Sequence, residues 1–265
     1  MERPYILHMF TPGPQMSPFD VNMAADAGYQ IITPYCGIGL EAVAGLTQDA
    51  IFSRGPKGVA RTGIFIGGRD VLLAADMLER ANKAMVPPFV VSLFADPSGS
   101  YTTAAALVAC TEAALKKHHG TDLAGKRVLL LGGTGTVGRI AGVLCAQVGA
   151  TALLSSHRGV STAEAAAAET GQRFGVTLHG ISGQGEADLR ASLADADRLR
   201  AGQRHRVVHH ADARQPFGRH RIHIGGHEHA RGEGAIGRGH DLQAGGSHAH
   251  HHVGIGERGA QVGLA

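Results

Sequence analysis

The feature that most limits how this chain can fold is a glycine motif between an apolar segment and a helical one. Residues 126–131 form a short run that is apolar after one basic pair, and Gly133, Gly135 and Gly138 follow as G-x-G-x-x-G. Residues 140–148 then continue as a predicted helix. A strand that runs through this motif into a helix is typical of a parallel α/β sheet that binds a dinucleotide.

Each glycine of the motif has a separate physical role. The first permits a tight turn, the second lets the backbone approach a pyrophosphate, and the third lets helix and strand pack closely. The helix that follows offers unpaired N–H groups and the positive end of its dipole to phosphates. The alternative is a glycine-rich turn without a ligand. The predicted cofactor-binding residues of this loop are Gly133, Thr134, Gly135, Thr136, Val137 and Gly138.

The residues after the next predicted strand indicate which dinucleotide binds. An NAD site usually carries Asp or Glu about 20 residues after the motif, bonded to the ribose 2′-hydroxyl. Here Ser155 is followed by Ser156, His157 and Arg158, and no carboxylate comes before Glu164. Hydroxyls and a guanidinium suit a 2′-phosphate. We therefore predict that Ser156, His157 and Arg158 bind NADP, with NAD as the alternative cofactor and a solvated loop as the alternative role for Arg158.

Strand and helix patterns alternate along the first 197 residues, which predicts an α/β fold with a largely parallel sheet. Strands are predicted at 6–10, 30–34, 62–66, 89–94, 126–131, 151–154 and 176–178. Helices are predicted from Ser17-Pro18, at 40–46, 70–85, 103–117, 140–148, 162–173 and 189–196. The polar connector 120–125 suggests an N-terminal α/β domain at 1–120 and the N-terminal part of a Rossmann-type domain at 121–197. The Rossmann-type sheet is expected to be incomplete, with an irregular tail at 198–265.

Composition excludes several other classes of protein. No stretch reaches the roughly 18 uninterrupted apolar residues of a membrane helix, so no membrane partner is expected. No basic-then-apolar leader opens the chain. The cysteines Cys36, Cys110 and Cys145 are widely spaced and cannot form a disulfide framework. These observations predict a cytoplasmic protein.

The first half contains polar loops after its predicted strands but no standard catalytic signature. G-x-S-x-G, metal-spaced histidine pairs and a P-loop lysine are all missing, so no metal site is expected there. The loops are 16–22, 67–70 and 96–103. Because ligands of open α/β sheets bind beyond the carboxyl ends of strands, these loops are the predicted substrate wall. The alternative is helix capping, for which Ser17 and Thr102 are suitable residue types.

Several long motifs occur in these loops in a fixed order. They are M-S-P-F-D-V-N-M-A, G-L-T-Q-D-x-I-F-S-R, R-T-G-I-F-I-G-G, V-P-P-F and F-A-D-P-x-G-S-x-T-T. From about residue 8 to about residue 197 the chain resembles the bacterial NAD(P)-dependent methylenetetrahydromethanopterin dehydrogenases. The resemblance implies an oxidoreductase of one-carbon metabolism in methylotrophs. It would transfer hydride from the methylene bridge of a tetrahydromethanopterin-type carrier, or of methylenetetrahydrofolate, to NADP or NAD and leave the methenyl form.

The resemblance also implies site residues and a cleft between the two domains. Asp20 and Asp96 would contact the pterin and support the cationic methenyl product, and Thr102 and Thr103 would hydrogen-bond the carrier. Arg69 is a weaker candidate. The reaction needs orientation more than an acid–base pair. No tyrosine has lysine four residues later, so cyclohydrolase activity is not expected. A homo-oligomer is implied by the resemblance alone.

The last 68 residues differ sharply from the rest in composition. They hold 10 arginines, 5 acidic residues, no lysine, 12 of the 17 histidines and 14 of the 39 glycines. Our first hypothesis is a reading-frame change near Asp197 in a GC-rich gene. The frequencies of Gly, Ala, Arg and His rise together when GC-rich codons are read out of frame. The alternatives are a metal-binding histidine tract and nucleic-acid binding by the arginines. Sparse aromatic residues argue against nucleic acid, and no such partner is expected.

The altered tail has a functional consequence for the predicted enzyme. A Rossmann sheet needs its later strands to cover apolar surface. A chain that lacks them could keep cofactor binding and lose turnover. The alternative function is therefore a catalytically inactive NADP-binding remnant with a metal-binding, histidine-rich tail.

Overall fold

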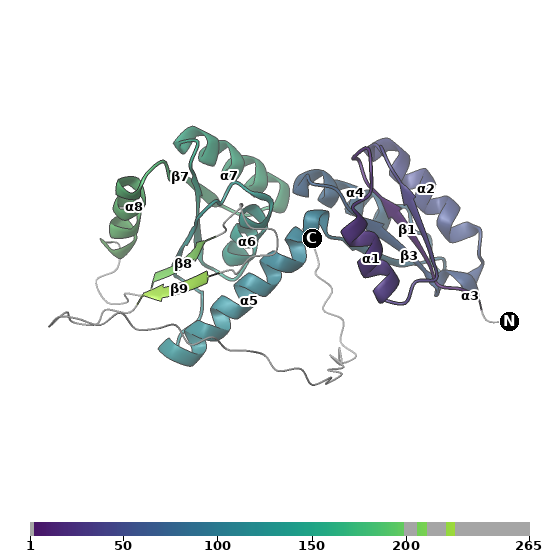
Figure 1. Ribbon diagram of the computed structural model, residues 1–265, viewed down its shortest axis with the longest axis horizontal. Helices are drawn as coiled ribbons and strands as arrows, with labels where there is room; N and C mark the ends of the chain where they lie inside the picture. The colour runs from purple at the N-terminus through teal and green to yellow at the C-terminus, as the bar shows by residue number, and fades with distance from the viewer. Residues whose placement is uncertain (1–2, 199–205, 211–220, 226–265) are drawn as a thin grey trace. The chain divides into compact units, whose positions relative to one another are not determined.

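The computed structural model describes residues 3–198, 206–210 and 221–225, with side chains described over residues 3–192. Two sheets organise these residues, in the strand orders β2-β1-β3-β4 and β7-β6-β5-β8-β9 (Figure 1). All pairings are parallel except that between β8 and β9. The predicted α/β class with parallel sheets is therefore confirmed.

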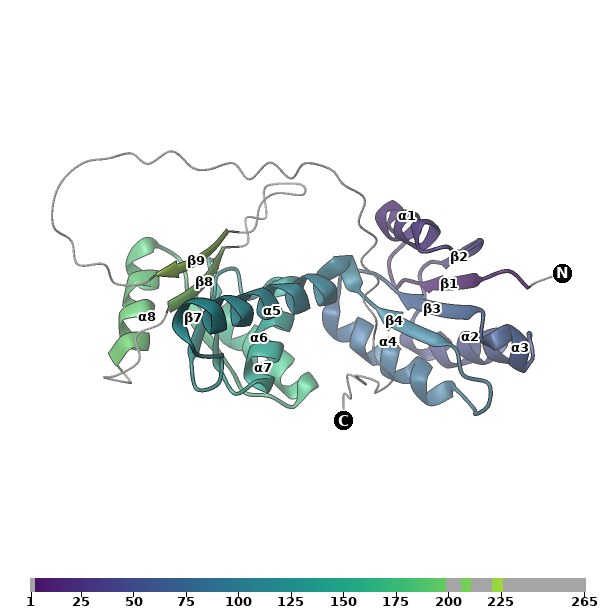
Figure 2. The ribbon, with the colours of Figure 1, turned by 90° about the horizontal axis from the view of Figure 1, so that it is seen from below.

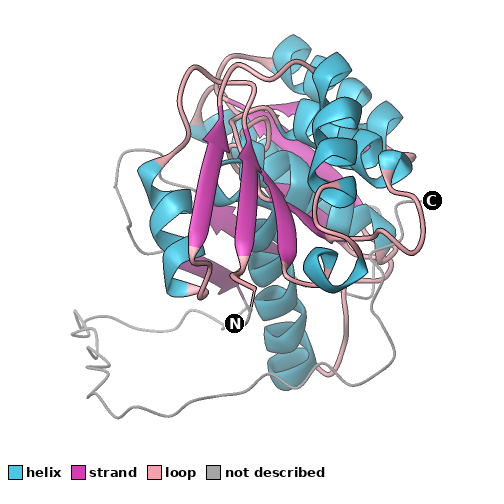
Figure 3. Ribbon diagram, turned by 90° about the vertical axis from the view of Figure 1, so that its right-hand side faces the viewer, coloured by secondary structure: helices cyan, strands magenta, loops and turns pink. Residues whose placement is uncertain are grey.

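One or two helices separate successive strands of the first sheet. Its elements are β1 (Ile6–Phe10), α1 (Pro18–Asp26), β2 (Ile31–Tyr35), α2 (Leu40–Phe52), α3 (Pro56–Val59), β3 (Thr62–Ile66), α4 (Val71–Ala84) and β4 (Ser92–Ala95). Successive strand residues point to opposite faces. Phe10, Ile64 and Ile66 pack against α2 and α4, whereas Leu7 and Met9 pack toward α1. Figures 2 and 3 show helices on both faces of these strands.

The second sheet follows the short 3-10 turn at Pro97–Gly99 and the long helix α5 (Ser100–His119). Its elements are β5 (Arg127–Leu130), α6 (Thr136–Gln147), β6 (Thr151–Ser156), α7 (Val160–Phe174), β7 (Leu178–Ser182), α8 (Glu186–Arg198), β8 (Arg206–His210) and β9 (Arg221–Gly225). Helix α5 packs on α6, and its Ala104, Val108 and Leu115 share a buried core with the apolar strands β5 and β6. Burial of these side chains is the main force that holds the helices on the sheet.

Several predicted elements have the expected bounds and others differ for local reasons. The strands at 6–10 and 62–66 are confirmed at both ends. The fourth strand begins only at Ser92, because a turn bridged between Val86 and Phe89 occupies the start of the predicted run. The short helix α3 was not predicted, and α2 extends to Phe52 instead of ending near residue 46.

Two segments of the tail that is predicted to be irregular form strands. Residues 206–210 pair with the free side of β5 as β8, and residues 221–225 pair with β8 as β9. β-branched residues in the two segments favour extended backbone, and β5 offers unpaired N–H and C=O groups on that side. The remaining tail, including His248, His250, His251 and His252 of the metal hypothesis, lies outside the described residues.

None of the helices in the described part of the chain combines the length and the apolar character that a membrane span requires.

Candidate functional site

A cleft of about 900 Å³ opens where the strands of the first sheet end. Its walls are the loop after β1, the first turn of α1, the loop after β3 and the segment that follows β4. The lining residues are Thr11, Pro12, Gly13, Pro14, Gln15, Met16, Ser17, Pro18, Phe19, Asp20, Gly68, Arg69, Asp70, Ser98, Gly99 and Thr103. The predicted substrate loops therefore meet at one place, as the parallel topology requires.

Asp20 is a carboxylate of this cleft whose surroundings raise its pKa. It lies in the first turn of α1, after Pro18, whose fixed φ suits the first helical position. Its Oδ2 would be 3.3 Å from a Cβ at position 67, so Gly67 leaves room for the carboxylate. No side chain or backbone group of the described residues hydrogen-bonds it. Burial, and next the charge of Asp96, raise the pKa of Asp20.

Asp96 is buried and bonds to the start of helix α5. Its Oδ1 accepts the backbone N–H of Tyr101 at 2.8 Å, and its Oδ2 accepts the Thr102 hydroxyl at 2.6 Å. Thr102 is therefore inside α5 and does not cap it, contrary to the capping alternative. Neither Asp96 nor Thr102 lines the 900 Å³ cleft, whereas Thr103 does. The Asp96 charge reaches the cleft through its effect on Asp20.

The glycine motif forms the loop between β5 and α6, and two of its glycines are required by close backbone contacts. A Cβ at Gly133 would lie 2.6 Å from the Leu154 Cα, and one at Gly138 would lie 2.7 Å from the Gly133 Cα. Gly135 precedes the first turn of α6, and a Cβ at this position would lie 3.3 Å from the Gly132 carbonyl oxygen. Gly133 therefore lets the loop pack on the sheet, and Gly138 lets α6 pack on the loop.

The residues after β6 lie partly in a pocket and partly outside it. Arg158 lines a pocket of about 470 Å³ together with Thr134, Ser161 and Thr162. Ser156 is buried, and its hydroxyl accepts the Arg158 backbone N–H at 3.1 Å. His157 is exposed and, like Ser156, is not part of the pocket wall. Ser161 and Thr162 were missed by sequence reasoning, because their position on the pocket side of α7 has no motif.

A dinucleotide fits what this loop offers. Gly133 and Gly138 let strand, loop and helix approach closely, and the first N–H groups of α6 have no partner within the helix, so they can donate to a pyrophosphate. No carboxylate follows β6 directly, and the guanidinium of Arg158 lies in the adjoining pocket. This donor set suits a phosphate on the ribose better than a free 2′-hydroxyl.

A third pocket, of about 410 Å³, shares residues with both of the others. Arg69 and Asp70 belong to it and to the cleft at Asp20, while Thr134, Arg139 and Glu169 belong to it and to the pocket at Arg158. The three hollows therefore border one another along these shared side chains. Arg139 and Glu169 were not predicted, although Arg139 directly follows the third motif glycine.

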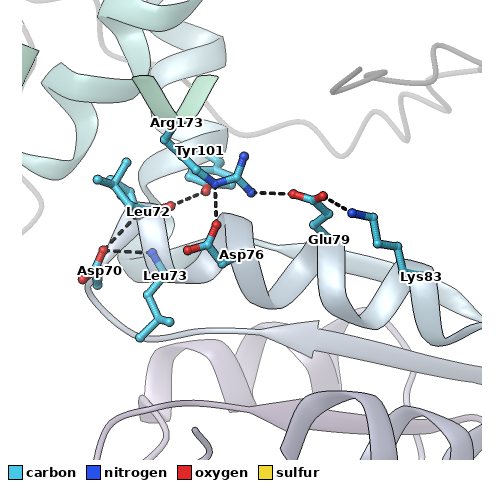
Figure 4. Close-up of polar contacts among 9 residues, drawn as sticks. Asp70, Leu72, Leu73, Asp76, Glu79, Lys83, Tyr101 and Arg173 are labelled. Atoms are coloured by element: carbon cyan, nitrogen blue, oxygen red, sulfur yellow. Dashed lines mark hydrogen bonds and ion pairs between the residues drawn. The ribbon is translucent and has the colours of Figure 1, made fainter. Parts of the chain in front are cut away.

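Helices α4 and α7 are joined by polar contacts of Arg173 (Figure 4). Arg173 Nε lies 2.5 Å from Asp76 Oδ1, and Arg173 Nη2 lies 3.1 Å from Glu79 Oε2. The Tyr101 hydroxyl donates to the Val71 carbonyl at 2.6 Å, and burial raises the pKa of that phenol. The Arg173 contacts fix α4 against α7, the helix that carries Glu169, and the Tyr101 hydrogen bond fixes the start of α4 to α5.

Groups of three or more histidine, cysteine, aspartate or glutamate side chains that could hold a metal ion do not occur in the described part of the chain.

Comparisons with known proteins place the chain beside one family. Residues 18–98 match the N-terminal domain of methylene-tetrahydromethanopterin dehydrogenases. The chain is 50% identical over 192 residues to the NAD(P)-dependent methylenetetrahydromethanopterin dehydrogenase of Methylorubrum extorquens, which covers 72% of this chain and 65% of that relative. It is 35% identical over 173 residues to the bifunctional protein MdtA of the same organism, covering 65% of this chain and 58% of the relative.

The chain therefore spans less than two thirds of the length of each of these relatives. The resemblance predicted from the loop motifs is confirmed by both matches. Through residues 18–98 the chain is similar to the N-terminal domain of the methylene-tetrahydromethanopterin dehydrogenases.

Proposed function

We propose that this chain is an NADP-preferring methylenetetrahydromethanopterin dehydrogenase, with NAD as a second acceptor. The observation that carries the proposal is the 410 Å³ pocket, because its wall includes residues of the cleft at Asp20 and residues of the glycine-motif loop. A carrier in the cleft and a dinucleotide on the loop would meet there. The 50% identity to a relative of this name supports the same reading.

The proposed chemistry asks the protein to orient and to stabilise charge. Bound NADP would supply the hydride acceptor. Gly133, Gly135 and Gly138 would hold its pyrophosphate on backbone N–H groups, with Ser156, His157 and Arg158 toward the ribose phosphate. Thr134, Thr136 and Val137 complete the proposed loop contacts.

The acidic side of the cleft would stabilise the product. The methenyl form is cationic, and the unpartnered carboxylate of Asp20 can face that charge. Asp96 adds a second negative charge from its buried position at the start of α5 and is held there by Thr102. Thr103 lines the cleft and can donate a hydrogen bond to the carrier.

An anaerobic assay of the 265-residue chain tests the proposal. Methylenetetrahydromethanopterin is mixed with NADP, and the absorbance of reduced nicotinamide is followed, with NAD and methylenetetrahydrofolate in parallel cells. We expect turnover with NADP to exceed turnover with NAD. Folded protein that binds NADP without turnover in any cell would instead support the inactive remnant.

Homo-oligomerisation and a cytoplasmic location remain parts of the proposal that rest on the resemblance and on cysteine usage. Sedimentation of the purified chain measures the first of these directly. A single monomeric species across the assay concentration range would contradict it.

A further inference from the structure

The ion pair between Arg139 and Glu169 lies beside the motif loop, and the proposed dehydrogenase activity assigns it no role. Arg139 Nη1 lies 2.8 Å from Glu169 Oε2, and Arg139 Nε donates to the Thr134 carbonyl at 3.3 Å. The guanidinium is therefore attached to the loop on one edge and to a carboxylate on the other. Loss of the carboxylate would leave the loop attachment in place.

The pair forms part of the wall of two pockets. Arg139 and Glu169 both line the 470 Å³ pocket, in which Arg158 and the hydroxyl-bearing Ser161 and Thr162 also lie. Two guanidinium groups and two hydroxyls in one pocket are the donors that bind a phosphate monoester. Glu169 contributes the opposite charge to the same wall, and a carboxylate competes with phosphate for an arginine.

The exposure of the two side chains indicates whether a phosphate can replace Glu169 as the partner of Arg139. The Glu169 side chain is 60% exposed, whereas that of Arg139 is 21% exposed. A carboxylate so open to water holds its partner weakly. A phosphate near charge −2 can accept two parallel N–H bonds from a guanidinium and can therefore displace Glu169.

We propose that Arg139 is the second arginine of a 2′-phosphate subsite and that Glu169 is the counter-ion that competes with it. The pair then sets how strongly the chain prefers a 2′-phosphorylated dinucleotide over an unphosphorylated one. This inference rests on the proposed function for the identity of the ligand. It concerns binding, so it can be measured without turnover.

The test is calorimetric binding of adenosine 2′,5′-bisphosphate and of 5′-AMP to the full chain and to two variants. Glu169→Gln removes the competing charge and should lower the Kd of the bisphosphate about 5-fold. Arg139→Gln should raise that Kd about 10-fold. Neither change should move the Kd of 5′-AMP by more than about 2-fold, because that ligand lacks the group that Arg139 would bind.

Three controls separate a direct role from a structural one. Arg190→Gln removes an arginine from another exposed arginine–glutamate pair, with Glu186 on α8, and should leave both Kd values unchanged. In the double variant, Glu169→Gln should have no effect once Arg139 is glutamine. Arg139→Lys keeps the charge but loses the planar fork, and should restore part of the affinity.

The inference fails if Glu169→Gln weakens bisphosphate binding, or if Arg139→Gln weakens both ligands equally, which would mean support of the loop through Thr134. It also fails if the wild-type chain does not distinguish the two ligands. Failure of the proposed function looks different: the Kd pattern would hold while methylenetetrahydromethanopterin gave no reduced nicotinamide. Turnover with NADP and no Kd pattern would overturn the inference alone.

Discussion

The two ligand-binding regions proposed here are built in opposite ways. At the second sheet, the loop after β5 is shaped by backbone contacts, and a side chain at Gly133 or Gly138 has no space. At the first sheet, the cleft is lined by side chains from several loops, and its key carboxylate, Asp20, has no hydrogen-bond partner among the described residues. A backbone site tolerates few substitutions, whereas a side-chain site can change its chemistry without losing its fold.

The largest effect that this comparison predicts follows from a methyl group at the backbone site. Gly133→Ala would place Cβ 2.6 Å from the Leu154 Cα and 2.8 Å from the Leu130 carbonyl oxygen, and neither atom belongs to a flexible side chain. We expect the free energy of unfolding to fall by about 3 kcal/mol. NADP binding should be lost at the same time. Denaturant titration and calorimetry measure the two effects.

Gly45→Ala is the matched control for this substitution. Gly45 lies inside α2, and a Cβ there meets nothing within 4 Å. This change should raise the free energy of unfolding by about 0.5–1 kcal/mol, because alanine favours helix over glycine. Equal stability losses in the two variants would refute the distinction between a backbone-defined loop and an ordinary helical glycine.

The side-chain site should respond to Asp20→Asn with lost activity and kept structure. We expect kcat with methylenetetrahydromethanopterin to fall about 100-fold while the Kd of NADP stays the same. In the wild type, activity should also fall as pH drops through the raised pKa of Asp20, because protonation removes the charge that faces the product. The variant should lack that pH dependence.

The same substitution should stabilise the fold near neutral pH. A carboxyl whose pKa is raised in the folded state binds its proton more tightly there than in the unfolded chain. Stability is therefore lost as pH rises from the ordinary carboxyl pKa through the folded one, and asparagine avoids that loss. Asp26→Asn, on the exposed side of α1, is the control. A lower Tm for Asp20→Asn at pH 7 would contradict this account.

The smallest effect is expected where α4 and α7 meet. Arg173→Gln removes the contacts to Asp76 and Glu79 and should lower the free energy of unfolding by about 1 kcal/mol, because Arg173 is only partly exposed. Lys83→Gln breaks another pair of Glu79, and both of its side chains are exposed, so this variant should change stability less than Arg173→Gln does. Thermal melts of both variants rank them. A larger effect for Lys83→Gln would show that the link between the helices is dispensable.

The sequence predicted the backbone-defined region better than the side-chain region. G-x-G-x-x-G has fixed spacing because three nearby backbone contacts fix it, so a local pattern is enough to find it. The strands at 6–10 and 62–66 were likewise predicted by local apolar runs. Asp20 was found only through a family resemblance, since a lone aspartate near a helix start is typical of many surfaces.

Other parts of the site could not be predicted because their partners lie far apart in the chain. Arg139 meets Glu169 across 30 residues, and Arg173 meets Asp76 across 97. No spacing rule connects such pairs before the helices pack. Asp96 was predicted as a cleft acid, but its hydrogen bonds to α5 depend on the turn at Pro97–Gly99, which reverses the chain locally.

The pairing of β8 with β5 has a consequence for how the chain behaves in solution. Strand β5 leads into the motif loop, and it has a neighbour on each side only because residues 206–210 occupy the side away from β6. Without them β5 would be an open edge strand of apolar residues, which can template pairing with other chains. We therefore expect residues 206–210 to protect the motif strand from intermolecular aggregation.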